Sequence, residues 1–131
     1  MDMLLEVVTV PVRDIDTAKD FYANKVGFTV DMDVQMSESV RFVQLTPAGS
    51  HCSIHLGGST VMEPGTLKGL ILVVDDAAAA KAAVDAKGVG SSDVEEQPWG
   101  RHVYFSDPDG NTWTLQESFA RNKRRAEQAA G

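Results

Sequence analysis

The pattern of apolar and polar residues predicts the same order of elements twice along the chain. In the first half it predicts a helix that begins at Asp14 or Asp16, where a carboxylate can cap the first turn, and ends at Gly27. The strands expected around this helix are 6–12, 28–34, 40–46 and 52–56. Residues 58–67 contain a Pro-Gly pair and no periodicity, so they are interpreted as a linker.

The second half repeats this order. An alanine-rich helix over 77–87 is expected between the capping residue Asp76 and Gly88. The strands expected around it are 70–74, 89–95, 101–105 and 112–116. Between the last two strands, Asp107-Pro-Asp-Gly-Asn111 has the composition of a tight turn, because proline presets φ and glycine tolerates a positive φ.

The two halves form an internal repeat of about sixty residues. The corresponding positions are Val12-Arg-Asp14 with Val74-Asp-Asp76, Gly27-Phe28 with Gly88-Val89, and 52–56 with 111–115. One βαβββ unit leaves a sheet face uncovered, so two units side by side predict an α+β fold with a curved mixed sheet, helices on one side and a cleft on the other. The prediction is one domain over 1–117, with modules over about 5–57 and 68–117, followed by a basic tail over 118–131.

Strand alternation divides the side chains of this predicted sheet between its two faces. The cleft face is expected to carry Val7, Thr9, Phe42, Gln44, His55, His102, Tyr104, Thr112 and Thr114. The helix face is expected to carry Val8, Val10, Ile54, Leu56, Leu72, Val103, Phe105, Trp113 and Leu115. The cleft would therefore be polar and aromatic, and the helix face would form the core.

Composition narrows the classes of function. The 131 residues suffice for a core without a disulfide or a metal, and 43% hydrophobic with 24% charged residues is ordinary for a soluble globular protein. The net charge of −7 disfavours nucleic-acid binding, and no apolar run is long enough to span a membrane. A single cysteine and an N-terminus without signal-peptide features favour a cytoplasmic location. The basic run within 118–131 is interpreted as a solvated tail.

Several short segments together resemble the signatures of a known family. They are Val10-Pro-Val-Arg-Asp14 followed by Ala18 and Phe21-Tyr22, then Val26-Gly-Phe28, Val73-Val-Asp-Asp76 and Asp107-Pro-Asp-Gly-Asn111. In this order they resemble the two modules of the vicinal oxygen chelate superfamily, which contains glyoxalases, bleomycin resistance proteins and extradiol dioxygenases. The resemblance covers roughly 5–117. It implies paired βαβββ modules around a cleft, and commonly a homodimer.

Metal-dependent members of that superfamily place four ligands on four strands that face the cleft. The resemblance maps these positions onto Val7, His55, Gly69 and Thr114. Only His55 keeps a residue type that the family uses, since Val7 and Gly69 offer no donor and Thr114 stands where a glutamate is expected. A divalent metal needs about three to four His or carboxylate ligands, so no metal cofactor is expected. A substitute site with His102 and Glu117 is disfavoured, because Glu117 falls on the opposite strand face from Thr114.

The remaining polar and aromatic residues of the cleft face are candidates for ligand contact. They are Phe42, Gln44, His55, His102, Tyr104 and Thr114, with Trp99 at the pocket rim. An imidazole titrates near neutral pH, so His55 and His102, together with Tyr104, are also candidates for proton transfer. Alternatively, the two histidines only satisfy each other or the backbone. Trp99 is either a stacking lid for a flat aromatic ligand or a residue that packs a loop.

Two functions from different classes remain open. The first is a metal-independent protein that binds a small aromatic or hydrophobic molecule in its cleft, similar to the drug-sequestering resistance proteins of the superfamily; the acidic surface suits a cationic or planar guest. The second is a metal-independent lyase or isomerase that uses His55 and His102 as acid and base. A metal-dependent lyase or dioxygenase is a weaker alternative. The sequence does not name the ligand.

Overall fold

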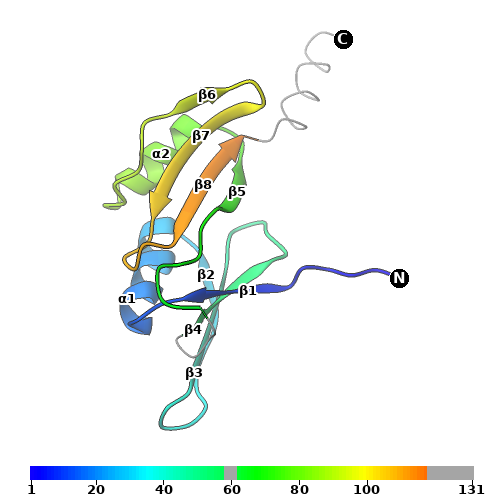
Figure 1. Ribbon diagram of the computed structural model, residues 1–131, viewed down its shortest axis with the longest axis vertical. Helices are drawn as coiled ribbons and strands as arrows, with labels where there is room; N and C mark the ends of the chain where they lie inside the picture. The colour runs from blue at the N-terminus through cyan, green and yellow to red at the C-terminus, as the bar shows by residue number, and fades with distance from the viewer. Residues whose placement is uncertain (58–61, 118–131) are drawn as a thin grey trace. The chain divides into compact units, whose positions relative to one another are not determined.

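The structure, a computed structural model, describes residues 1–57 and 62–117 (Figure 1). By their contacts, the described residues form two compact units, one from 1–57, 62–68 and 107–111, and the other from 69–106 and 112–117. The predicted tail over 118–131 and part of the predicted linker, 58–61, lie outside the described residues. Each unit contains strand, helix and three strands in the predicted order, so the α+β class and the repeat of βαβββ modules are confirmed.

The first unit is built on a four-stranded sheet. Its elements are β1 (Val7–Pro11), α1 (Ile15–Asp20), the π-helix η1 (Phe21–Val26), β2 (Thr29–Gln35), β3 (Arg41–Thr46) and β4 (Ser53–Gly57). The strands lie in the order β1-β4-β3-β2, with β1 and β4 parallel and the other pairs antiparallel. Pro11 ends the edge strand β1, as expected for a residue that has no N–H to donate to a ladder.

The ends of the first helical segment follow the sequence closely. The carboxylate of Asp14 accepts hydrogen bonds from the backbone N–H groups of Asp16 and Thr17, so Asp14 rather than Asp16 is the N-cap. At the other end, Gly27 has a φ of 96°, which terminates the segment in the left-handed region. The predicted single helix is continuous, but its second half takes the wider π pattern.

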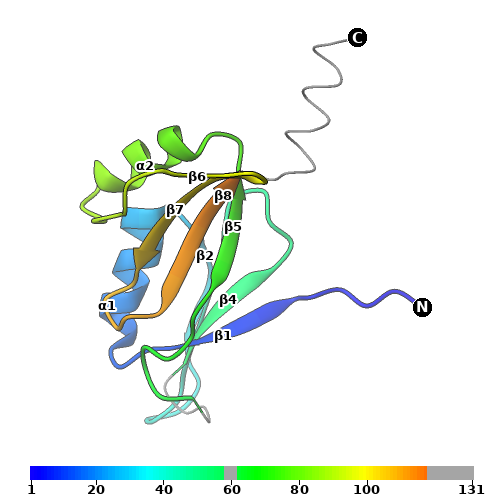
Figure 2. The same ribbon diagram turned by 45° about the horizontal axis from the view of Figure 1, so that its top comes forward.

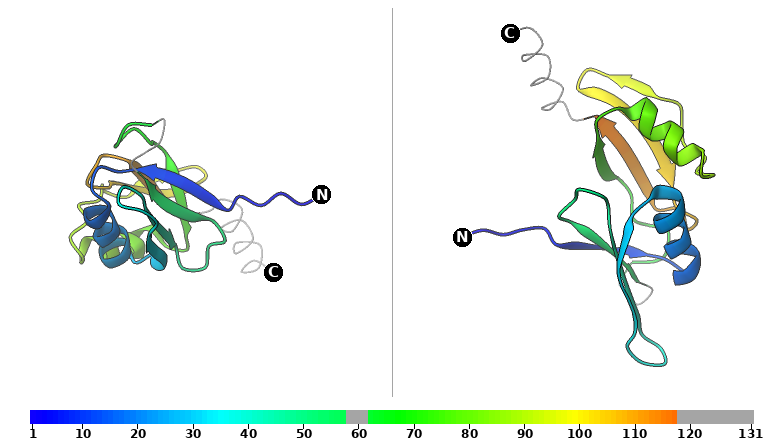
Figure 3. Two further views of the ribbon diagram at one scale, coloured as in Figure 1. Left: turned by 90° about the horizontal axis from the view of Figure 1, so that it is seen from below. Right: turned by 180° about the vertical axis from the view of Figure 1, so that it is seen from behind.

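The second unit repeats the arrangement of the first. Its elements are β5 (Leu70–Val74), α2 (Ala77–Asp85), β6 (Glu95–Gln97), β7 (Gly100–Ser106) and β8 (Thr112–Glu117). The strands lie in the order β5-β8-β7-β6, with β5 and β8 parallel. Figure 2 and the view from behind in Figure 3 show α2 packed along one face of this sheet, against β7 and β8. Asp76 caps α2 by accepting from the N–H of Ala79.

The strand predicted over 89–95 is wrong, because β6 comprises only Glu95–Gln97. Side-chain hydrogen bonds hold the preceding segment instead. The Asp85 carboxylate accepts from both the N–H and the hydroxyl of Ser91, at 2.9 and 2.8 Å. Ser92 then exchanges two hydrogen bonds with the Tyr104 backbone, one of them through its own hydroxyl oxygen. These serines attach the segment to α2 and β7, which the period of apolar residues cannot predict.

The register confirms which side chains share a face. Gln44 pairs with His55 across β3 and β4, and Tyr104 pairs with Thr114 across β7 and β8. The predicted helix-face residues alternate with them and are buried, apart from Val8 and Leu72, which are half-buried. The predicted cleft-face residues are half-buried or exposed, with the exception of His102, which is buried. The period of two therefore assigned the core correctly.

The turn after β7 belongs to the first unit by its contacts, although it lies in the second module of the sequence. Within the turn, Asp107 accepts from the N–H groups of Asp109 and Asn111, and Gly110 has the predicted positive φ, 99°. Asn111 is fully buried and donates to the carbonyl of Pro11 at 2.9 Å. The short motif that closes the second module is thus also a packing element of the first unit.

Among the helices formed by the described residues, none has the length and apolar character needed to cross a bilayer.

Candidate functional site

Two aromatic rings meet on the polar face of the first sheet, the face opposite to its buried core residues. Phe42 on β3 and His55 on β4 stack with their ring centroids 4.3 Å apart and their planes 23° apart. Gly57 lies beside this imidazole, since a Cβ there would lie 3.3 Å from Thr9 Cγ2 and 3.4 Å from a carbon of the His55 ring. Partial burial lowers the pKa of His55 below 6.5, so the ring is neutral at neutral pH.

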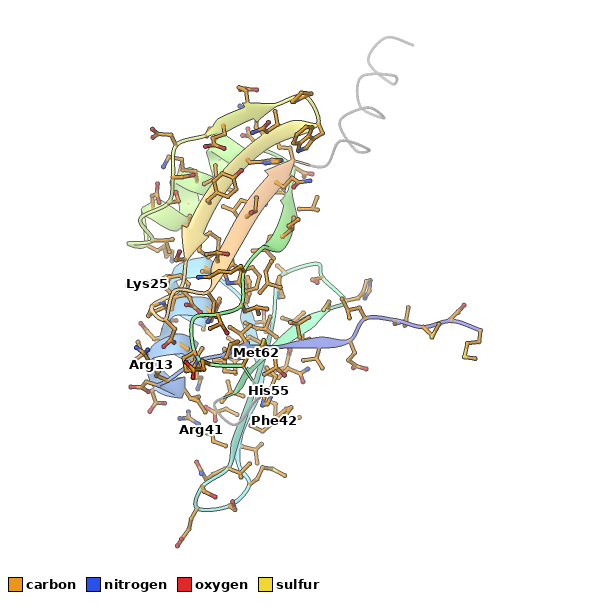
Figure 4. The ribbon with its side chains drawn as sticks, in the orientation of Figure 1. Arg13, Lys25, Arg41, Phe42, His55 and Met62 are labelled. Atoms are coloured by element: carbon orange, nitrogen blue, oxygen red, sulfur yellow. The ribbon has the colours of Figure 1, made fainter. Side chains whose placement is uncertain are left out.

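The Phe42–His55 stack forms one wall of a hollow of about 480 Å³, called here the first-sheet hollow. Its lining residues are Val12, Arg13, Ile15, Ser39, Val40, Arg41, Phe42, His55 and Gly57. Figure 4 labels Arg13 and Arg41 together with the two stacked rings. Among the described residues, the wall is therefore apolar and aromatic, with two guanidinium groups and no carboxylate. Gln44, predicted to contact the ligand, lies on the same strand face but does not line this hollow.

A second aromatic cluster lies on β7 and the turn before it. The indole N–H of Trp99 donates to Nε2 of His102 at 3.1 Å. The Tyr104 hydroxyl lies 3.5 Å from Nδ1 of the same imidazole, and the two rings meet edge to face. Because Nε2 accepts a hydrogen bond, the neutral His102 ring carries its proton on Nδ1. His102 is only 7% exposed, whereas Trp99 is 48% exposed and covers it.

A hollow of about 690 Å³ lies beside Tyr104 in the second unit, called here the second-sheet hollow. Its lining residues are Gly69, Gly90, Ser91, Ser92, Tyr104, Phe105, Ser106, Thr112, Trp113 and Thr114. It brings together two of the predicted ligand-binding residues, Tyr104 and Thr114. Trp99 and His102 do not line it. Burial and the neighbouring Glu95 carboxylate raise the pKa of Tyr104, so its phenol stays protonated and can donate a hydrogen bond.

The positions that hold metal in related proteins offer a poor donor set here. Val7 and Gly69 have no donor side chain, and only His55 supplies an imidazole. Glu117 is committed elsewhere: its carboxylate accepts from Arg101 at 2.7 Å and from the N–H of Ala77 at 2.8 Å, on the helix side of β8. Among residues 1–57 and 62–117, no cluster of three or more His, Cys, Asp or Glu side chains is suited to a metal ion. These residues do not fit a divalent metal.

Comparison with known proteins gives the family of this fold. The model of the Glyoxalase/Bleomycin resistance protein/Dioxygenase superfamily matches residues 4–115. The chain belongs to this superfamily. The recognition made from the motifs is therefore confirmed, and the shared fold explains why two βαβββ modules recur in one chain.

Two solved structures and one curated protein are similar to this chain over most of its length. TnmS3, an antibiotic binding protein from Streptomyces sp. CB03234, is 38% identical with a TM-score of 0.82, covering 89% of this chain and 97% of its own. A glyoxalase/bleomycin resistance protein from the same organism is 40% identical with a TM-score of 0.77, covering 86% and 98%. The uncharacterized protein YetH of Bacillus subtilis (strain 168) is 26% identical over 113 residues, 84% of this chain and 94% of its own length.

The predicted site residues fall into separate groups in this member of the superfamily. Phe42, Gln44 and His55 belong to the first unit, and the other four belong to the second. An acid–base pair formed by His55 with His102 therefore stays a prediction, as does the predicted homodimer.

Sequence reasoning missed the arginines of the first-sheet hollow. Arg13 follows β1 within the Val10-Pro-Val-Arg-Asp14 motif, and Arg41 opens β3. A charged residue at the end of a strand is ordinary for a solvated surface, so the pattern contained no signal for Arg13. For Arg41, the alternation with Phe42 even places it on the other strand face. Only the three-dimensional arrangement brings both to the hollow.

Proposed function

We propose that this protein binds a small aromatic or hydrophobic organic molecule and sequesters it without chemical change. The observation that carries the proposal is the Phe42–His55 stack on the wall of the first-sheet hollow. A flat ring that enters this hollow can stack on aromatic surface already held in place, so little side-chain entropy is lost on binding. The hollow of about 480 Å³ falls within the size range of sites for small molecules.

The second unit supports the same proposal. Trp99 and Tyr104 expose 48% and 38% of their surface on β7 and the turn before it, so both rings offer surface that a flat ligand can contact. The hydrogen bond from the indole to His102 holds the Trp99 ring, and Tyr104 meets the His102 ring edge to face. TnmS3 is an antibiotic binding protein, and its similarity to this chain favours an antibiotic-like ligand.

We propose further that binding requires no metal. Metal catalysis in this fold depends on ligands that converge on one ion, and three of the four positions here lack a His or carboxylate side chain. Glu117, which could have replaced one of them, is held by Arg101 and the start of α2. The side chains of the protein would therefore hold a ligand directly, without a metal ion between them.

A metal-independent lyase or isomerase is the second candidate. His55 favours it, because a lowered pKa leaves the imidazole neutral and able to accept a proton at neutral pH. His102 counts against it, because Trp99 occupies Nε2 and covers the ring. A general acid must reach the substrate, and this ring would have to release the indole first.

A binding screen with a turnover assay separates these functions. The melting temperature is measured with a panel of flat polycyclic natural products, in EDTA and with added Zn²⁺ or Ni²⁺, and each hit is then analysed by mass spectrometry for conversion. We expect stabilisation by intact ligands in EDTA, weakened in Phe42→Leu and His55→Gln. His51→Gln is the matched control, because His51 is exposed outside the hollow. If a hit is chemically converted, and His55→Gln abolishes that conversion, the protein is an enzyme. If ligands stabilise the protein only when a metal is added, the proposal that binding requires no metal is refuted.

A further inference from the structure

Arg13 is an uncommitted cation at the first-sheet hollow. It is exposed, lines the hollow, and its guanidinium has no ion-pair or hydrogen-bond partner among the described residues. The neighbouring carboxylate of Asp109 accepts the backbone N–H of Arg13 at 3.2 Å, not the guanidinium. The side chain is therefore available to a ligand.

Arg41, the other cation of this hollow, is already neutralised. Its Nε and Nη2 donate to Asp33 at 2.9 and 2.8 Å, and its Nη1 donates to Asp16 at 2.7 Å. Lys19 adds a further ion pair to Asp33 at 2.6 Å. This network holds Arg41 in place beside the hollow and gives each of its three guanidinium nitrogens a carboxylate partner. The two arginines thus have different roles: Arg41 is structural, and Arg13 is available to a ligand.

The described residues that line the hollow carry no negative charge. None of them is a carboxylate, and His55 is neutral at neutral pH. The net charge of −7 opposes an anion only at long range, where salt at about 0.15 M screens interactions beyond roughly 8 Å. At contact distance, a guanidinium offers a planar fork of donors that matches a carboxylate.

We infer that the first-sheet hollow selects aromatic compounds that carry an anionic group, with the ring against Phe42 and His55 and the anion on Arg13. This inference rests on the proposed binding function and names its ligand class. It differs from the expectation drawn from total charge, which favours a cationic guest. The local composition of the wall, not the charge of the whole chain, determines what a bound group contacts.

A series of three naphthalenes that differ only in charge tests this. Binding of 2-naphthoate, 2-naphthylmethanol and 2-naphthylmethylammonium to the full chain is measured by isothermal titration calorimetry at neutral pH and about 0.15 M salt. One charge-assisted pair at a partly exposed site is worth about tenfold in affinity. We expect 2-naphthoate to bind about tenfold tighter than the alcohol, and the ammonium compound to bind weakest.

Matched variants assign this preference to Arg13. Arg13→Gln should abolish the advantage of 2-naphthoate over 2-naphthylmethanol and leave the affinity for the alcohol unchanged. Lys25→Gln removes the same charge from the same unit outside the hollow, and should preserve the advantage (Figure 4). Phe42→Leu should weaken all three compounds alike, because it removes the stacking surface and no charge. Circular dichroism confirms that each variant is folded.

The inference and the proposed function fail in different ways. Equal binding of the acid and the alcohol, or an advantage of the acid that survives Arg13→Gln, overturns the anionic class while aromatic binding stands. If the ammonium compound binds most tightly, the anionic class is also overturned, and the net negative charge of the whole protein determines the preference. If none of the three binds, the anionic class is refuted for this hollow, and the wider screen of natural products decides the binding function separately.

Discussion

The phenol of Tyr22 donates a hydrogen bond of 2.6 Å to Oδ2 of Asp107, and both side chains are buried. Tyr22 lies in η1, and Asp107 opens the turn that follows β7, 85 positions further along the chain. Asn111 donates to the same carboxylate oxygen at 2.8 Å and to the carbonyl of Pro11. One buried acid thus connects the helical segment, the turn and β1 within the first unit.

Removing the Tyr22 hydroxyl should destabilise the protein more than its size suggests. In Tyr22→Phe, the Asp107 carboxylate loses a buried donor, and we expect a loss of about 1–3 kcal/mol in the free energy of unfolding, measured by urea denaturation. Tyr104→Phe is the control, because Tyr104 is 38% exposed and the same change should cost under about 0.5 kcal/mol. Equal effects of the two substitutions would mean that the buried hydrogen bond adds nothing.

The indole of Trp99 should determine the tautomer of His102. With Nε2 accepting from Trp99, we expect the imidazole to be protonated at Nδ1, which long-range ¹⁵N–¹H NMR spectra distinguish directly. Trp99→Phe removes the donor and should give a mixture of tautomers. His55 in the same spectra serves as the internal control, since it belongs to the first unit and its ring stacks on Phe42. An Nε2-protonated His102 in the unsubstituted protein would contradict this hydrogen bond.

The lowered pKa of His55 should make the protein less stable as the pH falls below about 6.5. Burial disfavours the charged ring in the folded state, so the unfolded chain binds the proton more readily. The stability that the neutral His55 ring contributes is therefore fully present above the unfolded pKa of 6.5, and it is lost as the pH falls toward the lower folded pKa. We expect His55→Phe to flatten the decrease in melting temperature between pH 7 and 5, and His51→Gln to retain it. An identical decrease in His55→Phe would refute this.

Asp85 should contribute stability that disappears only in acid. Hydrogen bonds from Lys81 and from the N–H and hydroxyl of Ser91 lower its pKa from 3.8 to about 2. Its contribution is fully present above 3.8 and is lost as the pH falls through about 2. The difference in melting temperature between the unsubstituted protein and Asp85→Asn should therefore shrink across this window. Asp93→Asn, at an exposed position, should show no such change.

Much of the local structure could be predicted because short-range chemistry determines it. Asp14 and Asp76 cap helices through their own neighbours, and Gly27 and Gly88 end helical segments with a positive φ. The period of two in the strands assigned the buried face correctly, including Trp113, which is 3% exposed. The failed strand over 89–95 marks the limit of this reasoning, because hydrogen bonds from Ser91 to Asp85 and between Ser92 and the Tyr104 backbone hold that segment instead.

The candidate site could be predicted by residue type but not by arrangement. Alternation placed His102 and Tyr104 on one face, as observed. It could not show that the Trp99 indole donates to Nε2 of His102, which leaves the proton of the neutral imidazole on Nδ1. It could not show that Arg13 lines the hollow beside Phe42 either, since Arg13 and Phe42 lie on different elements.

The sequence by itself determined the two βαβββ modules, the faces of their strands and the superfamily, because these depend on residue spacing and on contacts between near neighbours. Tertiary structure alone decided which arginine of the first-sheet hollow has no partner among the described residues, Arg13 rather than Arg41, and which carboxylate, Asp107, accepts a hydrogen bond from the Tyr22 phenol. The physical reason is that both depend on side chains that folding brings together from distant segments, and no local preference encodes such pairing.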